Sequence, residues 1–288
     1  MGDLEMSIKV SYLGPKGTFT EYAAKIIFPN DELIPYKTIP ECMDAVSNGE
    51  TEYCVVPIEN AIEGTVNLTI DYLFHYELPI VADIVIPIRQ HLMVHPENVE
   101  RVDEIAAIYS HPQAIAQSHH FLRKNFPNVD IQYTNSTAAG AKYVKEHPEK
   151  IIAAIANEFA AETYGLSIVH RNIHDFQNND TKFVVLTKTG DSVPLNDKYV
   201  GDKTTFKVTL PSDYSGALHQ VLSAFAWRKL NLTKIESRPL KTGLGNYFFI
   251  IDVEMKADSV LIPGVKAELE ALGCGVEIIG SYPCFKVD

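Results

Sequence analysis

Polar and apolar residues alternate along residues 7–188 with a spacing that changes repeatedly between the strand period and the helix period. Strand-like runs are predicted at 7–13, 53–58, 78–88, 106–110, 130–134, 151–156 and 166–172. Helical runs are predicted at 18–28, 65–74 and 112–126, and further helices open at Ser136 and Asn157. Strands that alternate with helices in this way are typical of α/β architecture with largely parallel sheets.

The pattern changes after residue 188. Residues 189–203 are rich in Gly, Asp, Asn and Lys, show no period and are predicted to form a linker. Beyond them, strands are predicted at 204–210, 231–239, 246–255 and 276–285, and helices at 216–229 and 261–272. This βαββαβ order is ferredoxin-like, with a hairpin turn predicted at 243–246. The chain is therefore predicted to hold two domains, 7–188 and 204–288.

Composition narrows the classes of partner. The 288 residues include 46% hydrophobic residues, 25 Lys and Arg, and 37 Asp and Glu, which gives a net charge of −12. Nucleic acids and membrane surfaces are anionic, so we expect neither as a partner, although a local group of donors can still bind a small anion. The chain shows neither a signal peptide nor a run of about 18 apolar residues, so export and membrane insertion are not expected.

The cysteines also argue against export. Cys42, Cys54, Cys274 and Cys284 are widely spaced and form no CxxC pair. This spacing favours reduced thiols over a disulfide framework or a zinc site. We therefore expect a cytoplasmic protein without a structural metal.

Several polar loops follow predicted strands, where open α/β sheets bind ligands. GPKGTF brings Lys16 close to a helix that Thr18 and Glu21 can cap through an S/T-x-x-E box. The other loops contribute Glu59 and Asn60, then Ser110, His111 and Gln113, then Ser136 and Thr137. Each loop also has an ordinary interpretation as a turn or a helix cap.

The stretch NNDTKFVVL is the least ordinary of these loops. Residues 178–180 favour a turn, and Phe183 opens an apolar strand. Thr181 and Lys182 place a hydroxyl and a cation at the junction, where a plain turn needs neither. Neither a Walker A loop, a dinucleotide fingerprint nor a G-x-S-x-G elbow occurs in the sequence.

Taken in order, GPKGTF, VPIENAIEGTV, SHPQAIAQ, NSTAAGA and NDTKF resemble the prephenate dehydratase family. GALHQVLSAF with KIESRP resembles the ACT regulatory domain that follows in that family. The resemblance implies two α/β lobes around a cleft, like periplasmic binding proteins, followed by an ACT domain at 204–288. It further implies a monofunctional enzyme of L-phenylalanine biosynthesis that converts prephenate to phenylpyruvate, CO₂ and water. The resemblance also implies that no metal or organic cofactor is needed.

The resemblance also implies roles for individual residues. Thr181 is implied as essential for dehydration, and the same family pattern gives catalytic roles to Glu59, Asn60 and Gln113. The residues implied to bind substrate are Ser110, His111, Ser136, Thr137, Lys182 and Phe183. Lys182 stands where the family usually has arginine, and lysine cannot make the planar two-pronged contact of arginine with a carboxylate. Ala61 stands where serine is common.

The second domain implies regulation. The resemblance predicts feedback inhibition by L-phenylalanine, with ACT domains of a homodimer or homotetramer paired across subunits. The implied phenylalanine-binding residues are Gly216, Ala217, Leu218, His219, Asn231, Glu236, Ser237, Arg238 and Pro239. By themselves, Glu236 and Arg238 are expected to form a surface ion pair on one strand face. A non-catalytic amino-acid sensor is the alternative function, since fold alone does not separate the two.

Overall fold

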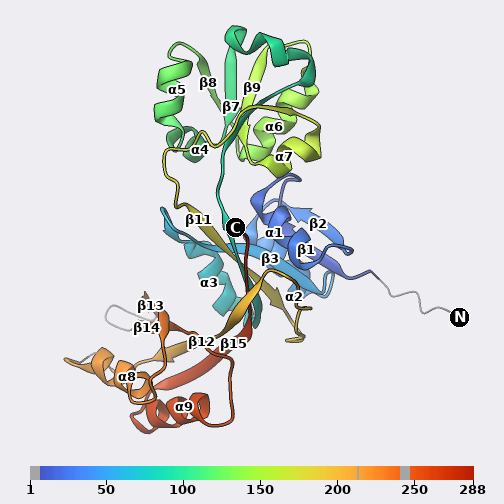
Figure 1. The fold of residues 1–288 in the computed structure, drawn as a ribbon. Coiled ribbons are helices and arrows are strands. Elements are labelled where there is room, and N and C mark those ends of the chain that lie inside the picture. Colours follow the sequence, from blue (N-terminus) through green and yellow to red (C-terminus); the bar gives the residue numbers. More distant parts are fainter. Residues whose placement is uncertain (1–6, 213, 241–246) are drawn as a thin grey trace, which may run out of the picture. The chain divides into compact units, whose positions relative to one another are not determined.

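The structure is a computed structural model that describes residues 7–212, 214–240 and 247–288 (Figure 1). It divides into two compact units. The first comprises the described residues up to Tyr76 together with Val85–Val184 and Val287–Asp288, and the second comprises Glu77–Ile84 and the described part of Val185–Lys286. The predicted hairpin turn at 243–246 lies outside the described residues.

The first unit contains two lobes, each with its own sheet. The first lobe holds β1 (Lys9–Leu13), α1 (Phe19–Ile27), β2 (Glu32–Tyr36), α2 (Ile39–Ser47), β3 (Tyr53–Asn60), β4 (Gly64–Thr65) and α3 (Asn67–Tyr76). Its strands lie in the order β11-β3-β1-β2, where β11 is Asp180–Thr187 and β1 is parallel to both neighbours. The sequence analysis did not predict β2 or α2, although Thr38 and Glu41 form a capping box that begins α2.

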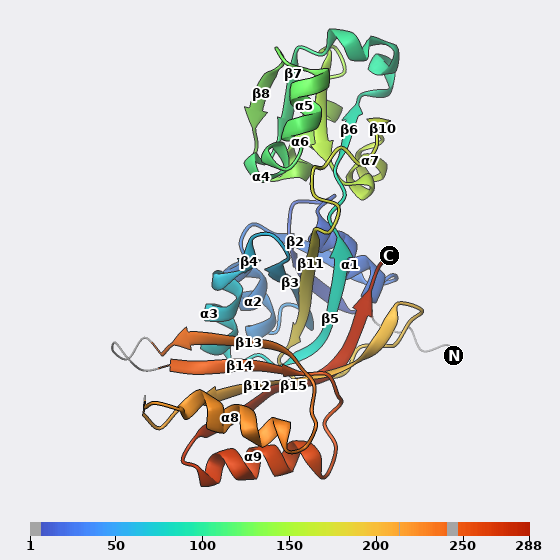
Figure 2. The same ribbon diagram turned by 60° about the vertical axis from the view of Figure 1, so that its left-hand side comes forward.

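The second lobe is built around the five-stranded sheet β10-β6-β9-β7-β8 (Figure 2). Its elements are β6 (His91–Val94), η1 (Pro96–Glu104), β7 (Ala107–Ser110), α4 (Pro112–Ala116), α5 (His119–Asn125), β8 (Asp130–Tyr133), α6 (Thr137–Glu146), β9 (Ile152–Ala156), α7 (Glu158–Tyr164) and β10 (Ser167–His170). The single helix predicted at 112–126 is wrong, because Ser118 leaves the helical conformation and separates α4 from α5.

Helix α6 is held close to its sheet by one small residue. A side chain at Gly140 would place its Cβ 2.7 Å from the Tyr109 carbonyl oxygen. Glycine therefore permits a backbone approach that any other residue would obstruct. Ser136 caps the helix by accepting from the backbone N–H of Ala139. Together these contacts fix the position of the α6 N-terminus.

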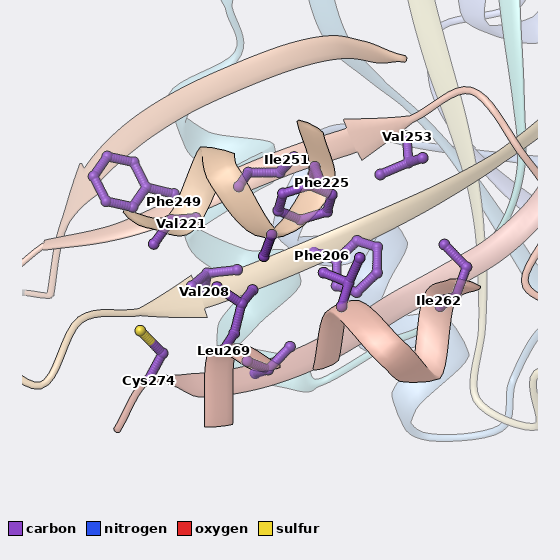
Figure 3. Packing of buried hydrophobic residues seen from close by; sticks show 13 residues of the cluster. Phe206, Val208, Val221, Phe225, Phe249, Ile251, Val253, Ile262, Leu269 and Cys274 are labelled. Atoms are coloured by element: carbon purple, nitrogen blue, oxygen red, sulfur yellow. The ribbon is translucent and has the colours of Figure 1, made fainter. Parts of the chain in front are cut away.

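The second unit has the predicted βαββαβ order. It consists of β12 (Tyr199–Thr209), α8 (Ala217–Ala226), β13 (Leu232–Pro239), β14 (Tyr247–Val253), α9 (Leu261–Ala271) and β15 (Gly275–Lys286), with the Ile80–Ile84 part of β5 (Ile80–Pro87). The strand order is β13-β14-β12-β15. Strand β12 begins at Tyr199, inside the predicted linker. Phe206, Phe225 and Ile251 lie in an apolar core between the sheet and its helices (Figure 3).

Among the described residues, no helix combines the length and the apolar character that crossing a bilayer requires.

Candidate functional site

A cavity of about 260 Å³ lies in the first unit and takes its walls from both lobes. The first lobe contributes Leu13, Thr18, Phe19, Thr20, Asn60 and Thr181. The second lobe contributes His111, Gln113, Ala114, Gln117, Asn135, Ser136 and Thr137. The segments that connect the lobes contribute Ile88, Gln90 and Asn179. The cavity therefore collects residues from nearly all the loops that the sequence analysis selected.

Asn60 at the end of β3 fixes the orientation of the Thr181 hydroxyl. The Asn60 Oδ1 accepts the backbone N–H groups of Ile62 and Glu63, both at 3.0 Å. These two bonds determine which end of the amide is oxygen, so Nδ2 must face Thr181. Nδ2 donates to the Thr181 Oγ1 at 2.8 Å. Because Oγ1 accepts this bond, the hydroxyl hydrogen of Thr181 remains available for donation.

The same amide polarity passes along a row of side chains. Asn60 Nδ2 also donates to Asn179 Oδ1 at 2.8 Å, so Asn179 Nδ2 points onward and donates to Gln117 Oε1 at 3.2 Å. Gln117 is only 6% exposed, and its Nε2 has no hydrogen-bond partner within the described chain. The row therefore ends in a buried donor on the cavity wall, ready for an acceptor on a ligand.

The cavity wall carries almost no formal charge. Among the described lining residues, His111 is the one with a titratable side chain. Helices α1 and α6 begin at the cavity with Phe19 and Thr137, and the first N–H groups of a helix have no partner inside the helix. These donors and the helix dipoles favour an anion at the cavity without a cationic side chain.

The structure brings together six of the residues predicted for the site. These are Asn60, His111, Gln113, Ser136, Thr137 and Thr181. Two of them also cap helices: His111 Nδ1 accepts the N–H of Gln113, and Ser136 caps α6. The ordinary interpretation as a helix cap and the functional one are therefore both compatible with these residues.

Ser110 does not line the cavity. It is fully buried, and its hydroxyl donates to the Ile155 carbonyl oxygen at 2.6 Å. This bond ties β7 to β9 inside the second lobe. A direct role of Ser110 in substrate binding stays a prediction without support from its position.

Glu59, Lys182 and Phe183 also lie outside the lining of the cavity. Successive side chains of a strand point to opposite faces, so Lys182 is directed away from Thr181. The Lys182 Nζ lies 3.6 Å from a Glu59 carboxylate oxygen. Phe183 shares the face of Thr181 but is 2% exposed and belongs to the core. The roles predicted for these residues stay predictions.

The GPKGTF loop does not have all its backbone N–H groups free to bind an anion. The backbone N–H of Gly17 donates to the Glu21 carboxylate at 2.5 Å, so this donor is already occupied. Thr18 accepts from the Glu21 N–H as the capping box requires, but Glu21 returns its bond to Gly17 instead of Thr18. Across from the loop, Asn157 donates to the Gly17 carbonyl at 3.1 Å and fastens it to the second lobe.

The sequence analysis missed Gln90, Gln117 and Asn179 as cavity residues. Gln117 could have been predicted from the sequence, because it ends the motif SHPQAIAQ that also contains Gln113. Asn179 was assigned only a turn role. Gln90 gave no sequence signal, since IRQHLMVH has the plain alternation of a strand.

The residues predicted to bind phenylalanine lie at two ends of the second unit. Strands β12 and β13 both run antiparallel to β14, so they are parallel to each other. Thr209 at the end of β12 and Arg238 near the end of β13 both pair with Phe248. Residues 216–219 therefore lie at the same end as 236–239, and Asn231 lies at the opposite end. The ion pair expected between Glu236 and Arg238 is present, with 3.6 Å between Oε1 and Nη1.

The comparisons with known proteins give the family. The model of the family described as Prephenate dehydratase matches residues 10–191, which is more than half of the chain. The prephenate dehydratase of Bacillus subtilis (strain 168) is 54% identical over 285 residues, covering 97% of this chain and 100% of that protein. The chain belongs to the prephenate dehydratase family. Prephenate dehydratases are hydro-lyases, and this chain is an enzyme of that class.

Two solved structures with different stated activities resemble this chain in fold. A prephenate dehydratase from Arthrobacter aurescens in complex with L-Phe is 32% identical, with a TM-score of 0.81 and coverage of 96% of this chain and 90% of that one. A protein described as GqqA, a novel type of quorum quenching acylase, is 26% identical, also with a TM-score of 0.81, and covers 96% of this chain and 98% of that one. The prephenate dehydratase fold thus also occurs in a protein with a different stated activity.

Proposed function

We propose that prephenate binds in the cavity of the first unit and is converted there to phenylpyruvate, CO₂ and water for L-phenylalanine biosynthesis. The observation that carries this proposal is the fixed pair of Asn60 and Thr181 on a wall of neutral donors. Prephenate has two carboxylates and a ring hydroxyl. A site for it must hold the carboxylates and assist the departure of the hydroxyl.

The neutral wall suits a substrate that loses CO₂. We assign carboxylate binding to the N-termini of α1 and α6 and to the unpaired Nε2 of Gln117. A cation beside the departing carboxylate would stabilise its charge and oppose the loss of CO₂. Helix N-termini and amides hold the anion by partial charges, which oppose decarboxylation less. Aromatisation of the ring supplies the driving force.

Thr181 is proposed to act on the leaving hydroxyl. Its oxygen accepts from Asn60, so its hydrogen can be donated to the oxygen of the ring hydroxyl. This bond stabilises the charge that develops on that oxygen as the C–O bond breaks. A threonine hydroxyl is too weak an acid to supply a proton by itself. The proton therefore has to arrive through a relay or a water, and His111 is the titratable side chain of the described lining that can take part.

One assay tests this function and its alternative together. The purified chain is mixed with prephenate, and phenylpyruvate and CO₂ are followed in time. We expect both products in equal amounts. Tight binding of prephenate or of an amino acid without any turnover would instead support a non-catalytic sensor.

We also propose that the second unit is an ACT domain that binds L-phenylalanine as a feedback inhibitor. The A. aurescens structure is a complex with L-Phe, which supports this assignment. Because residues 216–219 and Asn231 lie at opposite ends of the unit, one ligand can contact both only where two copies of the chain meet. The proposal therefore includes a homodimer or a larger homo-oligomer.

A charge placed at the start of α8 tests the regulatory proposal. Leu218 is 39% exposed. We expect Leu218→Glu to raise the half-inhibitory phenylalanine concentration at least about tenfold, because the apolar ring of the ligand would cover the new carboxylate and remove it from water. Activity without phenylalanine should remain. Val200→Glu, at an exposed position of the same unit, is the matched control. Equal sensitivity of both variants and the parent chain would contradict the assignment.

A further inference from the structure

The segment that leads from β5 to β6 directs its side chains alternately to two different cavities. Ile88 and Gln90 line the proposed substrate cavity. Arg89 and His91 line a separate cavity of about 160 Å³. This is the alternation of an extended backbone. The side chain of Gln90 is thereby directed at the substrate cavity, while the charged and titratable neighbours are directed elsewhere.

The backbone of Gln90 is fixed on both sides. Its N–H donates to His174 Nδ1 at 3.3 Å, and its carbonyl oxygen accepts the Ile173 N–H at 2.9 Å. Ile173 and His174 belong to the segment that returns from the second lobe to the first. Burial lowers the pKa of His174, which keeps its Nδ1 available as an acceptor. Gln90 is thus placed at a defined position where the two connecting segments lie side by side.

The amide oxygen of Gln90 has no hydrogen-bond partner within the described chain, although the residue is only 3% exposed. A buried polar atom without a partner is destabilising, and such atoms are rare in native structures. A residue with only a packing role would be less costly as leucine or methionine. Because Gln90 lines the cavity, a donor on the ligand can supply the partner that this oxygen lacks.

We propose that Gln90 binds the substrate by accepting the hydrogen of the ring hydroxyl. This inference rests on the proposed function. The ring hydroxyl has one hydrogen to give and lone pairs that can accept. Thr181 donates to its oxygen and Gln90 accepts its hydrogen, so the two residues hold the leaving group from both sides.

The reaction balances with this arrangement. The electron pair of the C–O bond leaves with the oxygen, and the electron pair of the bond to the carboxylate enters the ring as CO₂ departs. The oxygen takes one proton from the side of Thr181 and leaves as water, while its original hydrogen stays bonded to it and is donated in a hydrogen bond to Gln90. Gln90 itself forms and breaks no covalent bond. Its contribution is orientation and discrimination, because a site that bonds a substrate hydroxyl rejects an analogue without one.

Gln90→Leu is the direct test. It removes the acceptor and nearly keeps the shape, so we expect kcat/KM for prephenate to fall about 10- to 100-fold, the effect of leaving a substrate hydroxyl unpaired. Thermal stability should stay equal or rise, because an unpaired buried amide is replaced by an apolar group. Gln132→Leu, on the exposed side of β8, is the control for the same chemical change. A loss of stability without a loss of kcat/KM would show a structural role and overturn the inference.

Phenylpyruvate tests the part of the ligand that substrate and product share, since it keeps the pyruvate side chain and the ring carbons but lacks both the ring hydroxyl and the ring carboxylate. Its inhibition constant should be the same in the parent chain and in Gln90→Leu. If that constant rises as much as KM for prephenate, Gln90 contacts a shared part of the ligand and the hydroxyl assignment is wrong.

Gln90→Glu provides a second variant if leucine prevents folding. The carboxylate would face the two carboxylates of prephenate, with His111 as the titratable side chain of the described lining. We expect low activity near neutral pH that recovers relative to the parent chain as the pH falls, because a protonated glutamate again offers a neutral acceptor. A pH profile parallel to that of the parent chain would contradict the inference. If the parent chain turns prephenate over while both variants keep its kcat/KM, only the inference fails; absence of turnover in the parent chain defeats the proposed function itself.

Discussion

Each unit contains a buried polar network, and the two networks differ in the charge of their side chains. The network of the first unit runs from Thr181 through Asn60 to Gln117, uses neutral groups and ends in an unpaired donor. The network of the second unit is charged: Lys203 Nζ lies 2.5 Å from an Asp83 carboxylate oxygen, with 11% and 2% of the two side chains exposed. We call the first the open network, because it ends in a donor without a partner in the described chain. We call the second the closed network, because its charged groups pair with each other.

The closed network joins several strands of the second unit. Thr205 hydrogen-bonds to Asp252 and to the Tyr282 hydroxyl, both at 2.7 Å. Burial lowers the pKa of Lys203, but Asp83 and the other acidic groups beside it outweigh this cost and raise the pKa above its ordinary value. Among described residues, the buried side-chain atoms without a hydrogen-bond partner all lie in the first unit. Two of these four atoms, Gln90 Oε1 and Gln117 Nε2, belong to residues that line the cavity, and the other two belong to Tyr12 and Ser118.

The largest effect should come from the open network. Thr181→Val removes the hydroxyl and keeps the shape, so we expect kcat to fall about 10²- to 10⁴-fold, the usual range for a lost group that assists proton transfer. The thermal unfolding midpoint should change little. Thr163→Val, exposed on α7, is the control. Retention of kcat in steady-state assays with prephenate would remove Thr181 from the mechanism.

A substitution in the closed network should lower the stability of the fold. Lys203→Met leaves the Asp83 carboxylate buried without its cation, and we expect the free energy of unfolding to fall by about 3–5 kcal/mol. Urea denaturation measures this change. Lys198→Met, whose Nζ lies 3.2 Å from Asp197 at the surface, should cost less than about 1 kcal/mol. Similar losses in the two variants would show that Lys203 is not a buried ion-pair partner.

The raised pKa of Lys203 fixes the sign of a pH effect in the parent chain. The stabilisation is fully present below the ordinary lysine pKa of about 10.4 and is lost as the pH rises through the higher value of the folded state. As the pH is raised, the difference in unfolding free energy between the parent chain and Lys203→Met should therefore persist until strong alkali and shrink there. A difference that disappears between pH 6 and about 8 would contradict this assignment.

A smaller effect is expected where the polarity of the open network is reversed. Asn60→Asp keeps the oxygen that accepts from Ile62 and Glu63 but replaces the N–H donors with an acceptor. The Thr181 hydrogen would then turn to the new carboxylate, so we expect kcat/KM to fall about 10²-fold, comparable to the loss of one preorganised donor. Asn125→Asp, on the exposed end of α5, serves as the control. Equal kinetics for the two variants would mean that the orientation of Thr181 does not depend on Asn60.

The smallest effect is expected at Lys182. Its side chain projects from the face of β11 that lies opposite to the Thr181 side chain, and it pairs with Glu59. Lys182→Arg should therefore change KM for prephenate by no more than about twofold, as for surface substitutions in general. Steady-state kinetics settle this point. A large fall in KM would show that a cation at this position reaches a substrate carboxylate after all.

Much of the fold was accessible from local patterns. The alternation of strand and helix predicted the α/β lobes, and the βαββαβ order of the second unit was correct. Errors arose where local pattern and tertiary context disagree. The apolar period continues through 112–126, yet the chain breaks at Ser118, where the backbone carbonyl of Gln117 accepts the Asp175 N–H at 2.6 Å. The polar composition of 189–203 resembles a linker, yet β12 begins there.

The sequence by itself determined the family, the βαββαβ order of the second unit and most of the loops that line the cavity, because these depend on motifs and periods within short stretches of chain. Only the tertiary structure decided which side chains face one another. Asn60 and Thr181 are 121 residues apart, and Asp83 and Lys203 are 120 apart. No local period encodes such a pairing. For the same reason Lys182, which is next to Thr181 in sequence, points away from the cavity, whereas Gln90, which no motif marks, points into it.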